Sequence, residues 1–193
     1  MIIGITGQIG SGKTQVARIF ARHGACVISA DEIGKEVVDN NSRVLNRLVT
    51  AFGADILTPG GKLRRRVLGR IAFASDEGRR KLNAIVHPPL LRKLRGRMVQ
   101  ASREYDMVVV DAALLIDWGL EREIDLTILV HAPDRIKKAR LIEAGLSDQE
   151  IGSRLRVQLP FSVLKSRSDI VIYNNKSLSH LEAKVGKIIN KLL

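Results

Sequence analysis

The stretch from Gly7 to Thr14, GQIGSGKT, constrains the fold of this chain more than any other part of its sequence. It matches the pattern G-x-x-x-x-G-K-[ST] at every fixed position, after an apolar run at 2–6 and before a helical pattern that starts at Lys13. Glycines let the backbone curl so that successive N–H groups converge on phosphate oxygens, and the positive end of the following helix points at the same anion. The pattern therefore predicts a strand, a phosphate-binding loop and a helix.

The residues of this loop have separate expected roles. All eight are predicted to bind a nucleoside triphosphate: Gly7, Gln8, Ile9, Gly10, Ser11, Gly12, Lys13 and Thr14. Lys13 is expected to reach the β- and γ-phosphates, and the Thr14 hydroxyl is expected to ligate Mg²⁺. The alternative is a glycine-rich turn without a ligand, which the complete motif in this context disfavours. The motif predicts triphosphate binding but does not identify the group that receives the phosphate.

Five short apolar runs, rich in β-branched residues, alternate with helical patterns along the chain. The runs lack polar alternation, which is typical of parallel strands buried on both faces. We therefore predict an α/β fold with three layers, a five-stranded parallel sheet with helices on both faces. The predicted strands span 2–6, 27–29, 107–111, 126–130 and 170–173, and the predicted helices span 13–23, a set within 31–104, 134–143, 148–157 and 178–193.

The spacing of the predicted strands divides the chain into a core and two insertions. Roughly 75 residues separate the second strand from the third, far more than a crossover helix requires. We predict one domain, with a core at about 1–30, 106–135 and 168–193, a helical acceptor-binding subdomain at about 31–105 and a basic lid at about 136–167. Within the subdomain, His87 precedes Pro88 and Pro89, which indicates the start of a helix.

The chain is basic, with 32 Lys and Arg residues against 20 Asp and Glu residues in 193, a formal net charge of +12. Such a charge favours a polyanionic partner, either nucleic acid or a small molecule with several phosphates. Aromatic residues form only 4% of the chain, so a base-stacking surface is poorly supplied, and we do not expect nucleic acid as the main partner.

The apolar runs and the single cysteine indicate in which cellular compartment the protein is expected. No apolar run reaches the roughly 18 residues that suggest a membrane span, so no membrane partner is expected. The one cysteine, Cys26, cannot form an internal disulfide, and we predict that it is a small buried residue in a strand. A reducing cytoplasm fits this composition.

Several shorter motifs follow the phosphate-binding loop in order: SAD (29–31), LRRRVLGRIAF (63–73), LN (82–83), HP (87–88), DAALL (111–115), RL (140–141), RLRVQLP (154–160) and SDIVIYN (168–174). Each is weak alone, but together the chain resembles the dephospho-coenzyme A kinase family nearly end to end. The resemblance implies transfer of the ATP γ-phosphate, with Mg²⁺ as cofactor, to the ribose 3′-hydroxyl of dephospho-CoA. The match departs from the family pattern at four positions: Ser29 for aspartate, Ala113 for proline, Ala144 for a lid arginine and Lys176 for a glycine.

The resemblance also implies roles for side chains outside the loop. Asp31 is expected to accept or orient the proton of the acceptor hydroxyl. Arg140 is expected to stabilise the transferred phosphoryl group together with Lys13 of the loop. Acceptor binding is expected from Asp31, Arg65, His87 and Arg154, and further ATP binding from Arg140 and Asn174. Asp111 is expected to hold Mg²⁺ through water.

Each role has a purely structural alternative that the sequence leaves open. Asp31 and Asp111 are also placed to cap local structure, and His87 to make a structural hydrogen bond. Arg140 and Arg154 also fit a solvated helix face, and Asn174 also fits a turn.

Two other functions stay open. One is a kinase with the same loop that phosphorylates another small hydroxylated acceptor, such as a nucleoside or a nucleotide. The other is a nucleotide-dependent RNA-binding protein, for which the basic charge is the main support. A GTPase is disfavoured, because the segment 174–177, NNKS, lacks the aspartate of the guanine motif N-K-x-D.

Overall fold

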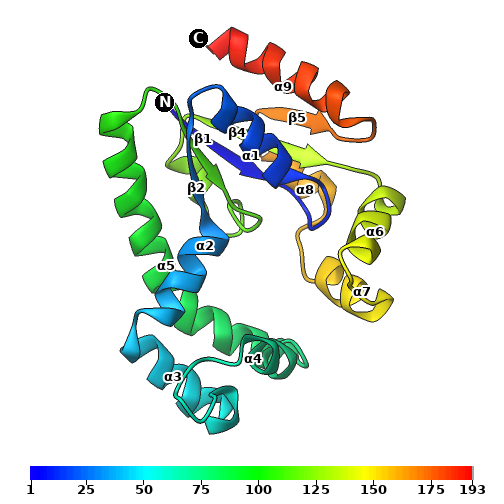
Figure 1. Cartoon of the computed structure of the whole chain (residues 1–193). Helices are drawn as coiled ribbons and strands as arrows, with labels where there is room; N and C mark the ends of the chain where they lie inside the picture. Colours follow the sequence, from blue (N-terminus) through cyan, green and yellow to red (C-terminus); the bar gives the residue numbers. More distant parts are fainter. Residues whose placement is uncertain (193) are drawn as a thin grey trace. The chain divides into compact units, whose positions relative to one another are not determined.

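The computed structural model describes residues 1–192, which form two compact units. The first unit comprises Met1–Ser29 and the chain from Met98 onward, and the second comprises Ala30–Arg97. The strands lie in the first unit, whereas the second is built from helices (Figure 1). No helix among residues 1–192 is both long enough and apolar enough to span a membrane.

The first unit is built on a parallel sheet of five strands with the order β2-β3-β1-β4-β5 (Figure 1). This sheet confirms the predicted fold class. The strands are β1 (Ile2–Thr6), β2 (Cys26–Ser29), β3 (Val108–Asp111), β4 (Leu126–His131) and β5 (Ile170–Tyr173). Ser29 pairs with Asp111 across β2 and β3, so these two strands end side by side.

Burial on both faces is confirmed only for the central strands. β1, β3 and β4 are almost entirely buried, whereas Val27 of β2 is 37% exposed and Tyr173 of β5 is 43% exposed. β2 and β5 are the edge strands, and an edge has a neighbour on one side only. The side chain of Cys26 is only partly buried, so the prediction that it is buried is wrong. The reason is the same, because Cys26 lies in the edge strand β2.

Helices cover both faces of this sheet. The helices that lie wholly in the first unit are α1 (Lys13–Arg22), the short 3₁₀ helix η2 (Leu120–Arg122), α6 (Asp134–Glu143), α7 (Asp148–Arg156), α8 (Phe161–Ser166) and α9 (Leu178–Leu192). Position 193, which the predicted last helix included, lies outside the described residues. The short α8 was not predicted separately. It starts after Pro160, and its Phe161 ring packs against His131 of β4 with ring centroids 4.0 Å apart.

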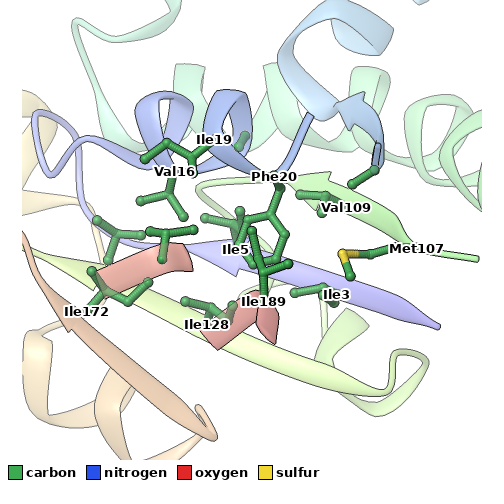
Figure 2. Close-up of a cluster of buried hydrophobic side chains, with 14 of the residues drawn as sticks. Ile3, Ile5, Val16, Ile19, Phe20, Met107, Val109, Ile128, Ile172 and Ile189 are labelled. Atoms are coloured by element: carbon green, nitrogen blue, oxygen red, sulfur yellow. The ribbon is translucent and has the colours of Figure 1, made fainter. Parts of the chain in front are cut away.

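The core of the first unit lies between the sheet and the pair α1 and α9 (Figure 2). Ile3, Ile5 and Ile128 of the strands meet Phe20 of α1 and Ile189 of α9, and all five are fully buried. Burying one such side chain stabilises a fold by about 1.5–3 kcal/mol. This packing holds α1, and with it the loop before α1, against the carboxyl ends of β1 and β4.

The second unit contains α2 (Ala30–Asp39), α3 (Ser42–Phe52), the 3₁₀ helix η1 (Ala54–Ile56), α4 (Arg65–Ala72) and most of α5 (Asp76–Glu104). Gly34 of α2 lies close to α5, where a Cβ at this glycine would be 3.2 Å from Leu90 Cδ1. Glu36 of α2 pairs with Lys93 and Arg97 of α5, each at 2.7 Å. Direct packing and these ion pairs join the two helices.

α5 continues through Pro88 and Pro89, so the predicted helix start at His87 is wrong. Two prolines remove two backbone hydrogen bonds and cost a helix about 3 kcal/mol or more each. Against this cost, the helix buries apolar side chains on both sides of the prolines, including Ile85, Leu90 and Leu94. Tertiary packing of this kind outweighs local preference.

Candidate functional site

Three glycines give the loop between β1 and α1 its curl. Gly7, Gly10 and Gly12 have φ angles of 144°, 77° and 96°, which side chains rarely tolerate. A Cβ at Gly7 would lie 2.2 Å from the carbonyl oxygen of Val130, and one at Gly12 would lie 2.2 Å from Asn174 Nδ2. Both the torsions and the space therefore require glycine at these positions.

The amino end of α1 is open to an anion. Gly12 caps the helix without a side-chain hydrogen bond, and no acidic residue occupies the first turn. The first N–H groups of a helix have no partner within it, and they carry the positive end of the helix dipole. This end of α1 is therefore suited to a phosphate group.

Lys13, Thr14 and Asp111 lie at the same end of the sheet. The Lys13 ammonium donates to the carbonyl oxygen of Gln8 at 3.4 Å, inside the loop. The Thr14 hydroxyl donates to Asp111 Oδ2 at 3.2 Å, and Asp111 is the last residue of β3, beside Ile5 of β1. A hydroxyl and a carboxylate side by side are oxygen ligands of the kind that Mg²⁺ prefers.

These oxygens do not form a metal site made by protein alone. Residues 1–192 contain no group of three or more His, Cys, Asp or Glu side chains that could hold a metal ion. Mg²⁺ in nucleotide sites typically keeps one or two protein ligands and takes the others from substrate phosphates and water. Thr14 and Asp111 fit that pattern.

Arg140 of α6 and Asn174, just after β5, both contact the loop. Arg140 Nη1 donates to the carbonyl oxygens of Gly10 and Ser11, and Nη2 donates to that of Asn174, each at 3.2 Å. Asn174 is buried, and its Nδ2 donates to the Ser11 carbonyl at 2.9 Å. The structure thus brings together the predicted loop, Arg140 and Asn174.

Two further side chains hold the loop and were not predicted to belong to the site. Gln158 accepts a hydrogen bond from the Ile9 amide through Oε1, at 2.9 Å. Lys137 of α6 is 2% exposed and contacts Gln8 Oε1. Gln158 belongs to the motif RLRVQLP (154–160), but the motif gave this residue no predicted role. Lys137 lies among other charged residues of a helix, and nothing local distinguishes it from them.

The other predicted residues belong to other helices. Asp31 is exposed in the first turn of α2, where its carboxylate also interacts favourably with the positive end of the helix dipole. Arg65 of α4 pairs with Asp39 of α2 at 2.6 Å. His87 lies within α5, and burial lowers the pKa of its imidazole. Arg154 is exposed in the last turn of α7. Asp31, Arg65 and His87 all belong to the second unit.

Comparison with known proteins identifies the family. The dephospho-CoA kinase family model matches residues 1–180. The dephospho-CoA kinase of Corynebacterium glutamicum is 37% identical over 193 residues, covering 99% of this chain and 96% of its own. That of Thermobifida fusca is also 37% identical, covering 98% and 95%. A crystal structure from Thermus thermophilus superposes with a TM-score of 0.82 at 32% identity, covering 100% and 98%. The chain therefore belongs to the dephospho-CoA kinase family, which catalyses the last step of coenzyme A biosynthesis.

Proposed function

We propose that this protein transfers the γ-phosphoryl group of ATP to the 3′-hydroxyl of the ribose of dephospho-CoA, giving coenzyme A and ADP. The observation that carries this proposal is the loop from Gly7 to Thr14. Its glycine torsions, the open end of α1 and Arg140 create a site for a polyphosphate. The family supplies the acceptor.

The loop binds the donor in this proposal. Backbone N–H groups and the amino end of α1 contact the phosphates of ATP, and Lys13 extends to the β- and γ-phosphates. Lys13 now donates within the loop to Gln8, so a bound phosphate replaces a weak 3.4 Å contact. Asn174 holds the Ser11 carbonyl and keeps the loop beside the end of β5, where the adenine is proposed to lie.

Thr14 and Asp111 are the proposed holders of Mg²⁺, Asp111 acting through water. The ion neutralises charge on the β- and γ-phosphate oxygens when it is bound. The hydroxyl and the carboxylate are already adjacent, so little side-chain movement is needed to place them around the ion.

Arg140 is proposed to stabilise the transferred phosphoryl group. A guanidinium has five N–H donors in a rigid fork, and three hydrogen bonds to backbone carbonyls fix it beside Gly10 and Ser11. Its positive charge stabilises the negative charge that spreads over the phosphoryl oxygens in the transition state.

The second unit is proposed to bind the acceptor and to orient its hydroxyl. Asp31 accepts or directs the proton of the 3′-hydroxyl, and Arg65 and His87 contact the acceptor together with Arg154 of α7. Arg65 already binds an oxyanion, the carboxylate of Asp39, so an acceptor phosphate would compete for the same guanidinium.

An assay of ADP release with a panel of acceptors tests the proposal. Dephospho-CoA should stimulate ADP release strongly, nucleosides and nucleotides should not, and Lys13→Ala should abolish the stimulation while the protein stays folded. A preference for a nucleoside or nucleotide would point to the alternative kinase. Salt-sensitive RNA binding without any acceptor-dependent ADP release would point to the RNA-binding alternative.

A further inference from the structure

Lys137 of α6 is a buried lysine that the proposed chemistry does not use. Its side chain is 2% exposed, and its ammonium contacts Gln8 Oε1 and, at 2.7 Å, Asp134 Oδ1. Asp134 is 89% exposed, so its carboxylate faces solvent, whereas the ammonium does not. An ammonium group is strongly disfavoured in a buried position unless it is paired and hydrogen-bonded. These two contacts therefore hold Lys137 firmly against the phosphate-binding loop.

The Gln8 side chain joins Lys137 to a second segment. Its Nε2 donates to the carbonyl oxygen of Leu159 at 3.1 Å, while its Oε1 contacts Lys137. The neighbouring amide of Ile9 donates to Gln158 Oε1 at 2.9 Å. Lys137 precedes α7 in the chain, and residues 158–159 follow it. Residues 8 and 9 of the loop are thus held from both ends of the segment that contains α7.

The backbone of Gln8 shapes the rest of the loop. Its carbonyl oxygen accepts from the Ser11 amide at 3.1 Å and from the Lys13 ammonium at 3.4 Å. The backbone of α6 also lies against the loop, because a Cβ at Gly10 would be 2.9 Å from the carbonyl oxygen of Lys137. Lys137 therefore holds Gln8, and Gln8 in turn positions the Ser11 amide and the Lys13 ammonium of the phosphate site.

We propose that Lys137 is a positioning residue that preorganises the phosphate-binding loop through Gln8 and thereby sets the affinity for MgATP. The inference rests on the proposed function for the identity of this ligand. A loop without the Lys137–Gln8 contact samples more conformations, and binding must then order it. The loss affects ground state and transition state alike, so KM for ATP rises while kcat changes little.

Calorimetric titration of MgATP into Lys137→Met, without any acceptor, tests the proposal directly. Methionine keeps the buried aliphatic volume and removes the charge and the donors. We expect Kd to rise about tenfold, as for the loss of one charge-assisted hydrogen bond. KM for ATP should rise by the same factor, with kcat within about twofold. Hydrogen exchange should also be faster at the amides of the loop in the ligand-free variant.

Lys138→Met is the matched control. It removes the same charge from the neighbouring position of α6, but Lys138 is 53% exposed and pairs with Asp148. Exposed pairs contribute little, so MgATP binding and loop exchange should match those of the wild type. An equal loss of affinity in both variants would mean that net charge, not positioning, sets binding, and would overturn the proposal.

The variants Gln8→Met and Gln8→Met/Lys137→Met complete the test. Because Lys137 acts through Gln8, the double variant should bind MgATP no more weakly than the weaker single variant. Fully additive losses, or wild-type affinity in Lys137→Met, would refute the inference. Gln8→Met removes the same contact but keeps the Lys137 ammonium and its pairing with Asp134. The same rise in Kd is expected for it, so the proposal can be refuted with Gln8→Met even if Lys137→Met does not fold. If the wild-type protein binds MgATP but leaves dephospho-CoA unmodified, the proposed function is refuted, whereas the inference about Lys137 is not.

Discussion

Replacing Gly12 with alanine should destabilise the protein through two separate effects. Gly12 has φ 96° and ψ 24°, a left-handed conformation that costs a residue with a Cβ about 1–2 kcal/mol. The new Cβ would also lie 2.2 Å from Asn174 Nδ2, which donates to the Ser11 carbonyl. Pushing this buried amide away from its partner costs about 1–3 kcal/mol. The free energy of unfolding should therefore fall by about 2–5 kcal/mol.

Thermal unfolding followed by circular dichroism measures this loss. For a chain of this size, 1 kcal/mol corresponds to a change in Tm of about 2–4 °C, so Tm should fall by roughly 4–20 °C. MgATP should bind more weakly as well, because the amides of residues 12–14 no longer converge. The stabilisation that saturating MgATP adds to the wild type should shrink accordingly.

Gly186→Ala is the control for the change of glycine to alanine as such. Gly186 lies inside α9, and nothing comes within 4 Å of a Cβ there. Alanine favours a helix over glycine by about 0.5–1 kcal/mol, so this variant should be at least as stable as the wild type. A Gly12→Ala protein with an unchanged Tm would refute the argument that torsion and space require glycine in the loop.

Three further substitutions test the site and its surroundings. Asp31→Asn should lower kcat by roughly 10² if the carboxylate accepts the acceptor proton, and steady-state rates near those of the wild type would leave it only a structural role. Asp111→Asn should raise the Mg²⁺ concentration needed for half-maximal activity several-fold while Tm stays within a few degrees, and an unchanged Mg²⁺ titration would remove Asp111 from the metal site. Burial lowers the pKa of His131 below its ordinary 6.5. As the pH falls through 6.5, the unfolded chain therefore takes up the proton before the folded protein does, and the folded protein becomes less stable than it is above pH 6.5. His131→Phe keeps the ring against Phe161 and should weaken this pH dependence in urea unfolding between about pH 7 and 5, whereas an unaltered slope would contradict it.

The phosphate-binding loop and the central strands could be predicted from the sequence alone because their causes are local. The glycine torsions at positions 7, 10 and 12 follow from the residues themselves, and β-branched apolar runs favour buried parallel strands wherever they occur. The order of short motifs then identified the family, with its reaction and its acceptor. Arg140 and Asn174 were named as site residues on that basis, and the structure places both beside the loop.

The tertiary structure alone decided which side chains support that loop and where packing overrides local preference. Lys137 and Gln8 are 129 residues apart, and Gln158 and Ile9 are 149 apart, so no local pattern indicates either contact. α5 continues through two prolines, and Cys26 is partly exposed because the order of the strands places β2 at an edge. Backbone torsion depends on adjacent residues, but the burial of a charge or a strand face depends on which distant segments pack against it.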